Sequence, residues 1–567
     1  MSSLAAKISP FAIAAIALLI SLGVLSGAGA ECYLFQLIAL AAAIVFSLNT
    51  KKIFWLILLP LIVILSLYFP VGFNFGPITK GYVSAFLATD MAEAGDLLKS
   101  IPLWHFFIPA ILIFSVIALK ITTDRYKISL CSVHLFAAFS ISLIFSCILF
   151  LFSGIDEERK LLGMSSRIMP FWRIIVFSIL TLGSLAAAKR LIKNSRANFA
   201  IPILFSISAL FCSYIAKDYH LPRKGIPYLI ETIKENRLMQ NTVQNNDWIV
   251  LSSKQNFRIN LIIIGESVRR DYMHAYGYPV QNTDFMDSVS GVVFEGFTSE
   301  GDGTIESLRR VLTYSRPNGE KVNFSLNLIG LAKKAGMSTA WFSNQGFATD
   351  CDTPISAIAS LAEQKRWLEL SFAQKKLDSE LLPLLKKEVA RPDSRPKLIV
   401  LHLHGSHPSV CSSVPAERYK EKMKDAYYRE SFCYVESLRD TDRLLGQAYQ
   451  ILKDSNSSFS MIYFADHGLS HNVIGNALTL KHSNPTRPHR DIPLLCASSS
   501  DTSHTHVRGR LFGDSFLEGV MNWLGITTQQ IPNPRNIFTA LHDTDTHNYE
   551  KIWKSRRDDP PIDIREH

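Results

Sequence analysis

Charged residues are scarce in the first 216 positions of this 567-residue chain. Of the 108 Asp, Glu, Lys and Arg residues, 24 lie before residue 217 and 84 after it, so the charged fraction rises from about 11% to about 24%. Only the second value is typical of a water-soluble domain. With 48% hydrophobic residues overall, disordered and collagen-like classes are excluded. We expect a membrane region (1–216), a helical linker (217–257) and a soluble domain (258–567).

The sequence also lacks features that several functional classes require. The net charge is +10, but no dense run of Lys and Arg and no basic stripe with interleaved aromatic residues occurs, so nucleic acid is not an expected partner. The chain has no C-x-x-C pair, which argues against a thiolate zinc site or a redox motif. The apolar segments contain almost no charge, which argues against a transporter or a sensor that only binds a ligand. The excess of basic residues is consistent with a protein that works beside anionic lipid head groups.

Seven apolar segments approach the roughly 20 residues that a membrane span needs. They lie near 8–29, 32–49, 53–70, 104–121, 128–152, 171–188 and 199–216. Lys and Arg cluster in the connections on one side, which the positive-inside rule places in the cytoplasm. An odd number of spans, whether seven or five, then puts everything after about residue 217 on the outer side of the membrane.

Cys411 and Cys433 flank a polar, charged insertion in the soluble domain. Because an extracytoplasmic domain can form disulfides, and this insertion would gain stability from one, we expect these two cysteines to be joined.

Short apolar runs alternate with longer amphipathic stretches in the soluble domain, which predicts an α/β fold with a largely parallel sheet. The runs are Ile259–Ile264, Ser338–Phe342, Lys397–Leu403 and Phe459–Phe464. In such sheets, ligands bind beyond the carboxyl ends of the strands.

The residues after these runs could bind a metal or a phosphate. They are Glu266 after the first run, Asn344 after the second, His402, His404 and His407 in or after the third, and Asp466 and His467 after the fourth. Two carboxylates and an imidazole from separate strand ends suit zinc. Each also has a local alternative: Glu266 beside a helix N-terminus, Asp466 and His467 as a hydrogen-bonding pair. Either His402 or His404 is expected to pack against the sheet.

Thr304 precedes the amphipathic stretch Ser307–Leu312, so it should stand at or near a helix N-terminus. Its hydroxyl could simply cap that helix. It could also act as a nucleophile, because exposed backbone N–H groups bind a phosphoryl oxygen and a nearby metal lowers the pKa of a hydroxyl.

Together these residues resemble the phosphoethanolamine transferases of the Gram-negative inner membrane, which belong to the alkaline-phosphatase and sulfatase superfamily. The resemblance covers most of the chain and rests on Ile264-Gly265-Glu266-Ser267, Tyr276-Gly277-Tyr278-Pro279, Thr304, Trp341–Gln345, Asp378 with Leu381-Leu382-Pro383, Leu401–His407 and Asp466-His467-Gly468. The stretches 357–359, 398–408 and 457–469 are most similar to the branch of the family that modifies osmoregulated periplasmic glucans.

The resemblance implies a fold and a location. The fold would be a multi-span α-helical membrane domain followed by an α/β alkaline-phosphatase/sulfatase-like domain with a mostly parallel central sheet. The protein would be a multi-pass protein of the cell inner membrane with its catalytic domain in the periplasm. The family typically has five spans where seven are counted here, and this chain has Glu436 where relatives usually have Asn, so no active-site role is expected at that position.

The resemblance also implies roles for single residues. Thr304 would be the nucleophile that becomes covalently modified, and zinc would be bound by Glu266, Thr304, Asp466 and His467. His407 and His482 would contact the phosphoryl group, His482 being preferred to His489 for its distance to the strand that begins at Ile492-Pro493. Asn344 and His404 would contact the substrate.

The implied reaction is transfer of phosphoethanolamine from phosphatidylethanolamine, a membrane lipid, to a hydroxyl of an envelope glycan or a lipid A-type glycolipid, with a periplasmic glucan favoured. A membrane-anchored phosphoglycerol transferase would use the same threonine chemistry. A phosphodiesterase or sulfatase-type hydrolase would pass the group to water, but sulfatases usually present Cys or Ser in a C-x-P-x-R pattern, which is absent beside Thr304.

Overall fold

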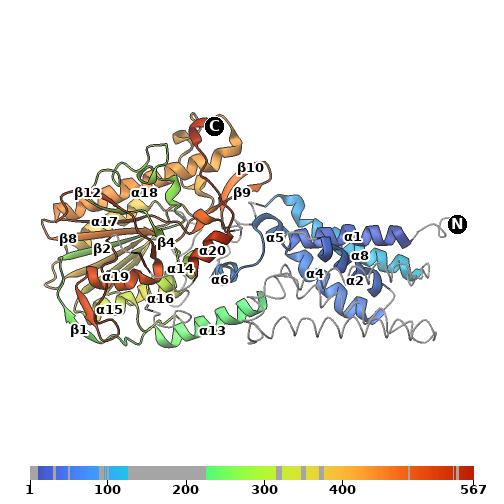
Figure 1. Cartoon of the computed structure of the whole chain (residues 1–567), viewed down its shortest axis with the longest axis horizontal. Coiled ribbons are helices and arrows are strands. Elements are labelled where there is room, and N and C mark those ends of the chain that lie inside the picture. Colours follow the sequence, from blue (N-terminus) through green and yellow to red (C-terminus); the bar gives the residue numbers. More distant parts are fainter. Residues whose placement is uncertain are drawn as a thin grey trace. The chain divides into compact units, whose positions relative to one another are not determined.

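The computed structural model describes residues 10–29, 34–48, 51–88, 95, 98, 101–125, 225–314, 322–346, 353–368, 376–482, 485–539, 542–543 and 548–567. The chain divides into two compact units, which Figure 1 colours along the sequence. The first comprises Met1–Thr79 and Ile101–Pro227, and the second comprises Lys80–Ser100 and Tyr228–His567. The segment 80–100, which the sequence places between two apolar segments, therefore belongs to the second unit.

The described residues of the first unit are mainly helical. Its helices are α1 (Pro10–Gly27), α2 (Leu34–Ser47), α3 (Lys51–Ile53), a π-helical turn at Phe54–Leu58, α4 (Leu59–Leu67), α5 (Phe69–Phe75) and α8 (Ile108–Arg125). Apolar side chains from α1, α2, α4 and α8 pack into one core. Within the described residues, the helical stretch Leu103–Arg125 is long and apolar enough to cross a membrane, and the bent pair Lys51–Leu67 with Phe69–Phe75 could form a second span. The predicted spans 128–152, 171–188 and 199–216 lie outside the described residues.

The second unit is built on an eight-stranded sheet in the order β12-β3-β11-β8-β2-β7-β5-β6. The strands are β2 (Ile259–Gly265), β3 (Gly291–Phe294), β5 (Ser338–Ser343), β6 (Gln364–Trp367), β7 (Lys397–His402), β8 (Phe459–Ala465), β11 (Leu494–Ser498) and β12 (His504–Val507). The four apolar runs of the sequence coincide with β2, β5, β7 and β8 to within one residue at each end. Every residue of these four strands is buried, as expected for strands covered on both faces.

The sheet is mixed: the strands that carry the site run parallel, as expected, β12 is parallel with β3, and β11 runs against both of its neighbours. β2 pairs in parallel with β7 and β8, and β5 with β6 and β7. β11 pairs antiparallel with both β8 and β3. The chain between β8 and β11 contains a hairpin and a short 3₁₀ turn but no helix among its described residues. A parallel crossover usually needs a helix, so β11 returns in the opposite direction.

Helices cover both faces of this sheet (Figure 1). On one face lie α17 (Leu381–Ala390) and α18 (Arg429–Asp454), and on the other lie α14 (Thr304–Val311), α15 (Leu328–Lys334), α16 (Pro354–Ser360) and α19 (Phe516–Trp523). Half of α18 is polar and half packs into the core, which is the pattern of an amphipathic helix on a sheet. This arrangement leaves the carboxyl ends of β2, β5, β7 and β8 together at one edge.

Smaller elements complete the second unit. They are the helices α6 (Lys80–Ala88), α13 (Ile226–Thr242) and α20 (Tyr549–Ser555), the strand pairs β1 (Val250–Ser253) with β14 (Ile526–Thr528) and β4 (Phe297–Thr298) with β13 (Leu511–Phe512), and the hairpin β9 (Ser470–Ile474) with β10 (Ala477–Lys481). The hairpin follows β8 directly, so it continues the chain from the carboxyl edge of the sheet.

Cys411 and Cys433, the pair expected from the sequence, form a disulfide across 22 residues. Cys433 lies buried in α18, and Cys411 lies in a short 3₁₀ turn beside that helix. The bond therefore ties the polar insertion after β7 to the long helix that covers the sheet. Cys496 is a free thiol and Cys351 lies outside the described residues.

Removing this disulfide should destabilise the second unit. A closed loop of this length lowers the entropy of the unfolded chain enough to contribute about 3 kcal/mol to the free energy of unfolding. We expect the double variant Cys411→Ser/Cys433→Ala to unfold at a lower temperature than the wild type when tryptophan fluorescence is followed in detergent, with reductant lowering the midpoint of the wild type only. Cys496→Ala is the matched control. An unchanged midpoint in the double variant would contradict the expectation.

Candidate active site

Glu266 and Ser267 form a tight turn at the carboxyl end of β2. Ser267 has a φ of 60°, a left-handed conformation that is uncommon outside glycine. Its backbone N–H donates to Asp466 Oδ1 at 3.0 Å, and its carbonyl accepts from the hydroxyl of Tyr434 at 2.7 Å. These bonds from β8 and α18 hold the strained turn in place, and they leave the Glu266 carboxylate fully buried at the edge of the sheet.

Asp466 and His467 follow β8, the strand beside β2. Asp466 Oδ1 accepts the backbone N–H groups of Ser267 and of His467. Asp466 Oδ2 accepts no hydrogen bond from any described residue, although it is buried. The Nδ1 atom of His467 lies 2.7 Å from the carbonyl of Gly468 and must donate to it, which leaves Nε2 with a free lone pair. That atom lies 3.4 Å from Asp466 Oδ2 and 3.4 Å from Glu266 Oε1.

Thr304 is the first residue of α14, and it does not cap the helix. The N-cap is Gly303, and it forms no side-chain capping bond. The Thr304 hydroxyl instead donates to Glu266 Oε2 at 2.9 Å, and it lies 3.3 Å from His467 Nε2. The structure thus brings together the four residues that the sequence proposed as a cluster, from β2, α14 and β8.

This cluster fits a metal ion. One ligand atom each from Glu266, Asp466 and His467 lies within 4.8 Å of the other two, and all three side chains are buried. A buried carboxylate oxygen without a hydrogen-bond partner is costly unless a cation neutralises it. Carboxylate oxygen and imidazole nitrogen in this number suit zinc, with the Thr304 hydroxyl close enough to complete the set.

The electrostatics of the cluster favour a cation. Burial and then repulsion from Glu266 raise the pKa of Asp466 to about 8. Burial lowers the pKa of His467, but Asp466 and Glu266 outweigh it and raise the value to about 9. Burial also acts to raise the pKa of Glu266, but its bond to His467 holds it well below the usual range. A proton on His467 therefore occupies the place that a metal ion would take.

The loop after β7 is fixed by Asp378. This carboxylate accepts the backbone N–H groups of His404 and Gly405, each at 2.8 Å. Gly405 has a φ of 52°, and a Cβ there would come within 2.8 Å of the Glu266 carbonyl, so only glycine fits. Asn344 donates to Asp378 and to the carbonyl of Lys376, so both hydrogens of its amide are used within the protein.

Four histidine rings lie near one another beside the cluster. His404 and His407 come from this loop, and His467 and His482 come from other segments. The ring centroids of His404 and His407 are 5.2 Å apart, and those of His407 and His482 are 6.1 Å apart. His482 stands at the end of β10, 4.7 Å from His467 between ring centroids. Its backbone carbonyl accepts a hydrogen bond from Tyr82 of α6. Burial and then the charge of His467 lower the pKa of His482 to about 3, so its ring is neutral at pH 7.

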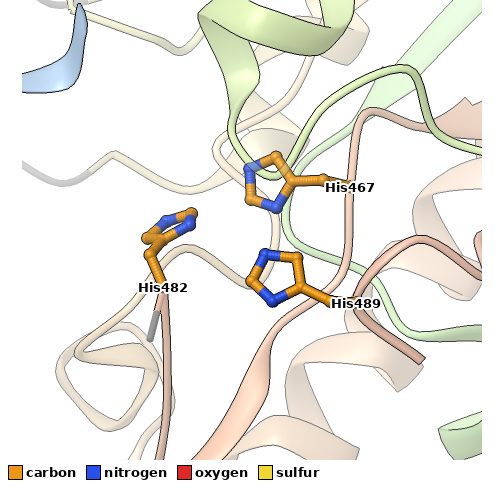
Figure 2. Close-up of side chains that lie close together, drawn as sticks. All are labelled: His467, His482 and His489. Atoms are coloured by element: carbon orange, nitrogen blue, oxygen red, sulfur yellow. The ribbon is translucent and has the colours of Figure 1, made fainter. Parts of the chain in front are cut away.

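Figure 2 shows His467, His482 and His489 pointing toward one another. Of the two candidates for phosphoryl contact, His489 has protein partners at both ring nitrogens. His489 Nε2 donates to the carbonyl of Asp302 at 3.0 Å, and its Nδ1 lies 3.0 Å from Ser470 Oγ. Both nitrogens of His489 are therefore engaged inside the protein.

Of His402 and His404, one packs against the sheet, as expected. His402 is buried in the sheet with its ring 6.0 Å from that of Trp341, and burial lowers its pKa to about 4. It lies in the packing, whereas His404 begins the loop at the strand end.

Two site residues were missed in the sequence. Gln345 donates to Glu266 Oε2 at 3.1 Å and to the carbonyl of Leu403 at 2.8 Å, so it orients the carboxylate. Its place after β5 was the available signal. Tyr434, which holds the turn at Ser267, lies in the middle of α18, and nothing in its local sequence indicates that contact. Glu436, for which no active-site role was expected, is buried in α18 and pairs with Arg418 and Arg439.

Comparisons with known proteins agree with the fold of the second unit, which is that of a sulfatase-type domain. The Sulfatase family model matches residues 259–526. A putative phosphoethanolamine transferase of Haemophilus influenzae is 30% identical over 434 residues, which cover 74% of this chain and 74% of that protein. The phosphoethanolamine transferase OpgE of Escherichia coli is 30% identical over 403 residues, which cover 67% of this chain and 75% of that protein.

One solved structure matches both units. The integral membrane protein lipooligosaccharide phosphoethanolamine transferase A (EptA) from Neisseria meningitidis has a TM-score of 0.54 at 14% identity, and the match covers 89% of this chain and 90% of that chain. At this identity the match shows a shared fold. On the sequence matches, the chain belongs to the phosphoethanolamine transferase family, and its second unit carries the sulfatase-type domain of that family.

Proposed function

We propose that this protein takes phosphoethanolamine from phosphatidylethanolamine onto Thr304 and passes it to a hydroxyl of an envelope glycan, with a periplasmic glucan as the favoured acceptor. The observation that carries the proposal is the position of the Thr304 hydroxyl, 2.9 Å from Glu266 Oε2 and 3.3 Å from His467 Nε2. A hydroxyl with no capping role, held beside a buried cluster of two carboxylates and an imidazole, is suited to nucleophilic catalysis.

Zinc is the proposed metal, held by Glu266, Asp466, His467 and Thr304. When bound, it would lower the pKa of the threonine hydroxyl and offset negative charge on the phosphoryl oxygens. The protein supplies the geometry: Ser267 N–H orients Asp466, Gln345 orients Glu266, and the Gly468 carbonyl fixes the His467 tautomer. Such supporting bonds are expected around a metal centre.

In the first step, the Thr304 oxygen attacks phosphorus and the bond from phosphorus to the diacylglycerol oxygen breaks. The threonine proton passes to Glu266 Oε2, which already accepts its hydrogen bond. Diacylglycerol leaves with a proton taken from solvent water, Glu266 keeps the threonine proton, and phosphoethanolamine remains on Thr304. Thr304 begins α14, so free N–H groups of the first turn point toward the phosphoryl oxygens.

In the second step, an acceptor hydroxyl attacks the same phosphorus and gives its proton to solvent water, the bond from phosphorus to Thr304 breaks, and Thr304 regains its proton from Glu266. His407 and His482 are proposed to contact the phosphoryl group, because each has a ligand atom within 4.8 Å of Glu266 and of the other. His482 is favoured over His489, whose two nitrogens are already bonded within the protein. Substrate contacts of His404 and Asn344 remain proposals, and Asn344 would have only its oxygen to offer.

The proposed location follows from the donor. A multi-pass membrane domain in the inner membrane would hold the catalytic domain on the periplasmic side, where the scissile bond of the lipid meets water. Tethering to the bilayer raises the effective concentration of the donor. The relative OpgE is named a phosphoethanolamine transferase, which supports the choice of head group.

The donor can be tested directly. The detergent-solubilised full-length protein, supplied with zinc, is incubated with mixed micelles of either phosphatidylethanolamine or phosphatidylglycerol and then measured by intact-protein mass spectrometry. We expect a phosphoethanolamine adduct with the first lipid and none with the second, and loss of the adduct when periplasmic glucan is added.

Other outcomes would redirect the proposal. An adduct only with phosphatidylglycerol would indicate a phosphoglycerol transferase. Free phosphoethanolamine without any acceptor would indicate a hydrolase. An adduct that glucan leaves in place but lipid A removes would keep the donor and change the acceptor.

A further inference from the structure

Asp302, two residues before Thr304, is held from three sides. Arg490 donates to its carboxylate from Nε at 2.8 Å and from a terminal nitrogen at 3.3 Å. Arg556 donates from both terminal nitrogens, at 2.8 and 2.7 Å. The backbone carbonyl of Asp302 accepts from His489 Nε2 at 3.0 Å. Both the side chain and the main chain of Asp302 are therefore held by hydrogen bonds.

Without these bonds, the loop that contains Asp302 would be free to move. Asp302 lies between Gly301 and Gly303, and glycine loses more conformational freedom on folding than any other residue. Gly303 is the N-cap of α14, so any movement of this loop shifts the first residue of the helix. Because misplacing a reacting group by about 1 Å can cost about 100-fold in rate, a fixed loop is of direct value to the reaction.

Arg556 comes from the far end of the chain, directly after α20, which Figure 1 draws beside α14. Within the described residues, both hydrogen bonds of its guanidinium go to Asp302. Two parallel N–H bonds from one guanidinium to one carboxylate fix orientation as well as distance. The side chains of both partners are largely buried, which protects the pair from screening.

The C-terminal tail that supplies Arg556 is itself anchored on the site. Asp559 accepts from Arg269 at 2.9 Å, two residues after the strained Ser267, and from the backbone N–H of His471 in β9 at 2.9 Å. Trp553 Nε1 donates to Asp491, next to Arg490, at 3.2 Å. The tail thereby joins the turn after β2, the hairpin after β8 and the loop before α14, three segments that contain or adjoin the proposed metal ligands and nucleophile.

We propose that Arg556 is a positioning residue for the transfer reaction, which holds the loop before α14 through Asp302 and so sets the position of the Thr304 hydroxyl. Arg490 and His489 hold the same residue from the side of the hairpin, so Arg556 is the part of the clamp that only the C-terminal tail provides. The inference rests on the proposed role of Thr304 as the nucleophile.

The test compares Arg556→Ala, Arg556→Lys and Arg565→Ala in the full-length protein. Arg565 lies in the same tail but is exposed and pairs with Asp563, so its variant controls for charge loss. With phosphatidylethanolamine as donor, we expect Arg556→Ala to lower the rate of adduct formation about 10- to 100-fold with KM within about twofold and bound zinc unchanged. Arg556→Lys should recover part of the rate, and Arg565→Ala should match the wild type.

Two further measurements separate positioning from a general loss of structure. Hydrogen exchange of the amides at 299–303 should become faster in Arg556→Ala while the strands of the sheet exchange as in the wild type. The effects of Arg556→Ala and Asp302→Ala on the rate should be non-additive, because they remove the same pair. A wild-type rate in Arg556→Ala, equal losses in the control variant, or a rise in KM alone would overturn the proposal.

The exchange measurement also keeps the two proposals apart. If the wild type forms no adduct with phosphatidylethanolamine, the proposed function fails, and faster exchange at 299–303 in Arg556→Ala would still establish the clamp. If the wild type forms the adduct and Arg556→Ala changes neither its rate nor the exchange, the clamp fails and the proposed function stands.

Discussion

Replacing Thr304 with alanine should abolish transfer. The Thr304 hydroxyl lies beside both Glu266 and His467, whereas the Ser267 hydroxyl, which also donates to Glu266, at 2.6 Å, has no bond to His467 among the described contacts. Because a covalent route loses its first bond-forming step without the nucleophile, we expect the rate of phosphoethanolamine transfer to fall on the order of 10³-fold or more. Intact-protein mass spectrometry with phosphatidylethanolamine should show no adduct on the variant.

Matched variants make this result specific. Thr304→Ser keeps a hydroxyl at the first position of α14 and should retain an adduct, formed more slowly because serine lacks the methyl group that restricts the rotamer. Thr505→Ala, on the exposed edge strand β12, should behave as the wild type. An adduct of normal mass on Thr304→Ala would place the nucleophile elsewhere and would contradict the assignment.

The strands that build the site could be predicted because they are buried on both faces. A run such as Ile259–Gly265, without polar alternation, is the pattern of a central strand in an α/β sheet. Since β2 and β8 are neighbours and parallel, the residues that follow them, Glu266 and Asp466, had to lie side by side. The proposed metal-binding cluster is therefore a direct consequence of strand order and of polar residues at strand ends.

The direction of β11 could not be predicted in the same way. A short apolar run such as Leu494–Ser498 contains no information on the direction of its neighbours. That direction depends on whether the connection contains a helix, and the hairpin β9–β10 takes the place of one.

Polar contacts between residues far apart in the sequence could not be predicted either. Asp302 and Arg556 are separated by 254 residues, and no local periodicity connects them. The same holds for Tyr434 and Ser267, which are separated by 167 residues. Such contacts depend on the final packing of loops and of the C-terminal tail, whereas hydrophobic patterns report only on single elements.

Removing the negative charge of Asp466 should remove the metal. We expect Asp466→Asn to lower zinc affinity by at least about 10²-fold, because the variant keeps the shape of the side chain but loses one of two anionic ligands. The adduct on Thr304 should disappear with it. Zinc bound per protein, measured by elemental analysis after dialysis, checks the expectation, and treatment of the wild type with a chelator should give the same loss of adduct.

A buried carboxylate outside the cluster provides the control. Asp442 accepts the backbone N–H groups of Phe285 and Met286, and burial raises its pKa to about 6. Asp442→Asn removes a buried charge of the same kind, so it should change stability and leave zinc content as in the wild type. Loss of zinc in both variants would mean that the effect is general and not specific to the cluster.

Stability distinguishes a metal ligand from an ordinary structural carboxylate. Without metal, Asp466 lies beside Glu266 with one oxygen unpaired, and burial and this repulsion raise its pKa. Asp466→Asn relieves the repulsion, so the metal-free variant should unfold at the same temperature as the metal-free wild type or at a higher one. Zinc at about 100 times its Kd should stabilise the wild type by about 2.7 kcal/mol and the variant hardly at all. A variant that is less stable than the wild type without zinc, yet gains equally from added zinc, would show that Asp466 supports the fold rather than the metal.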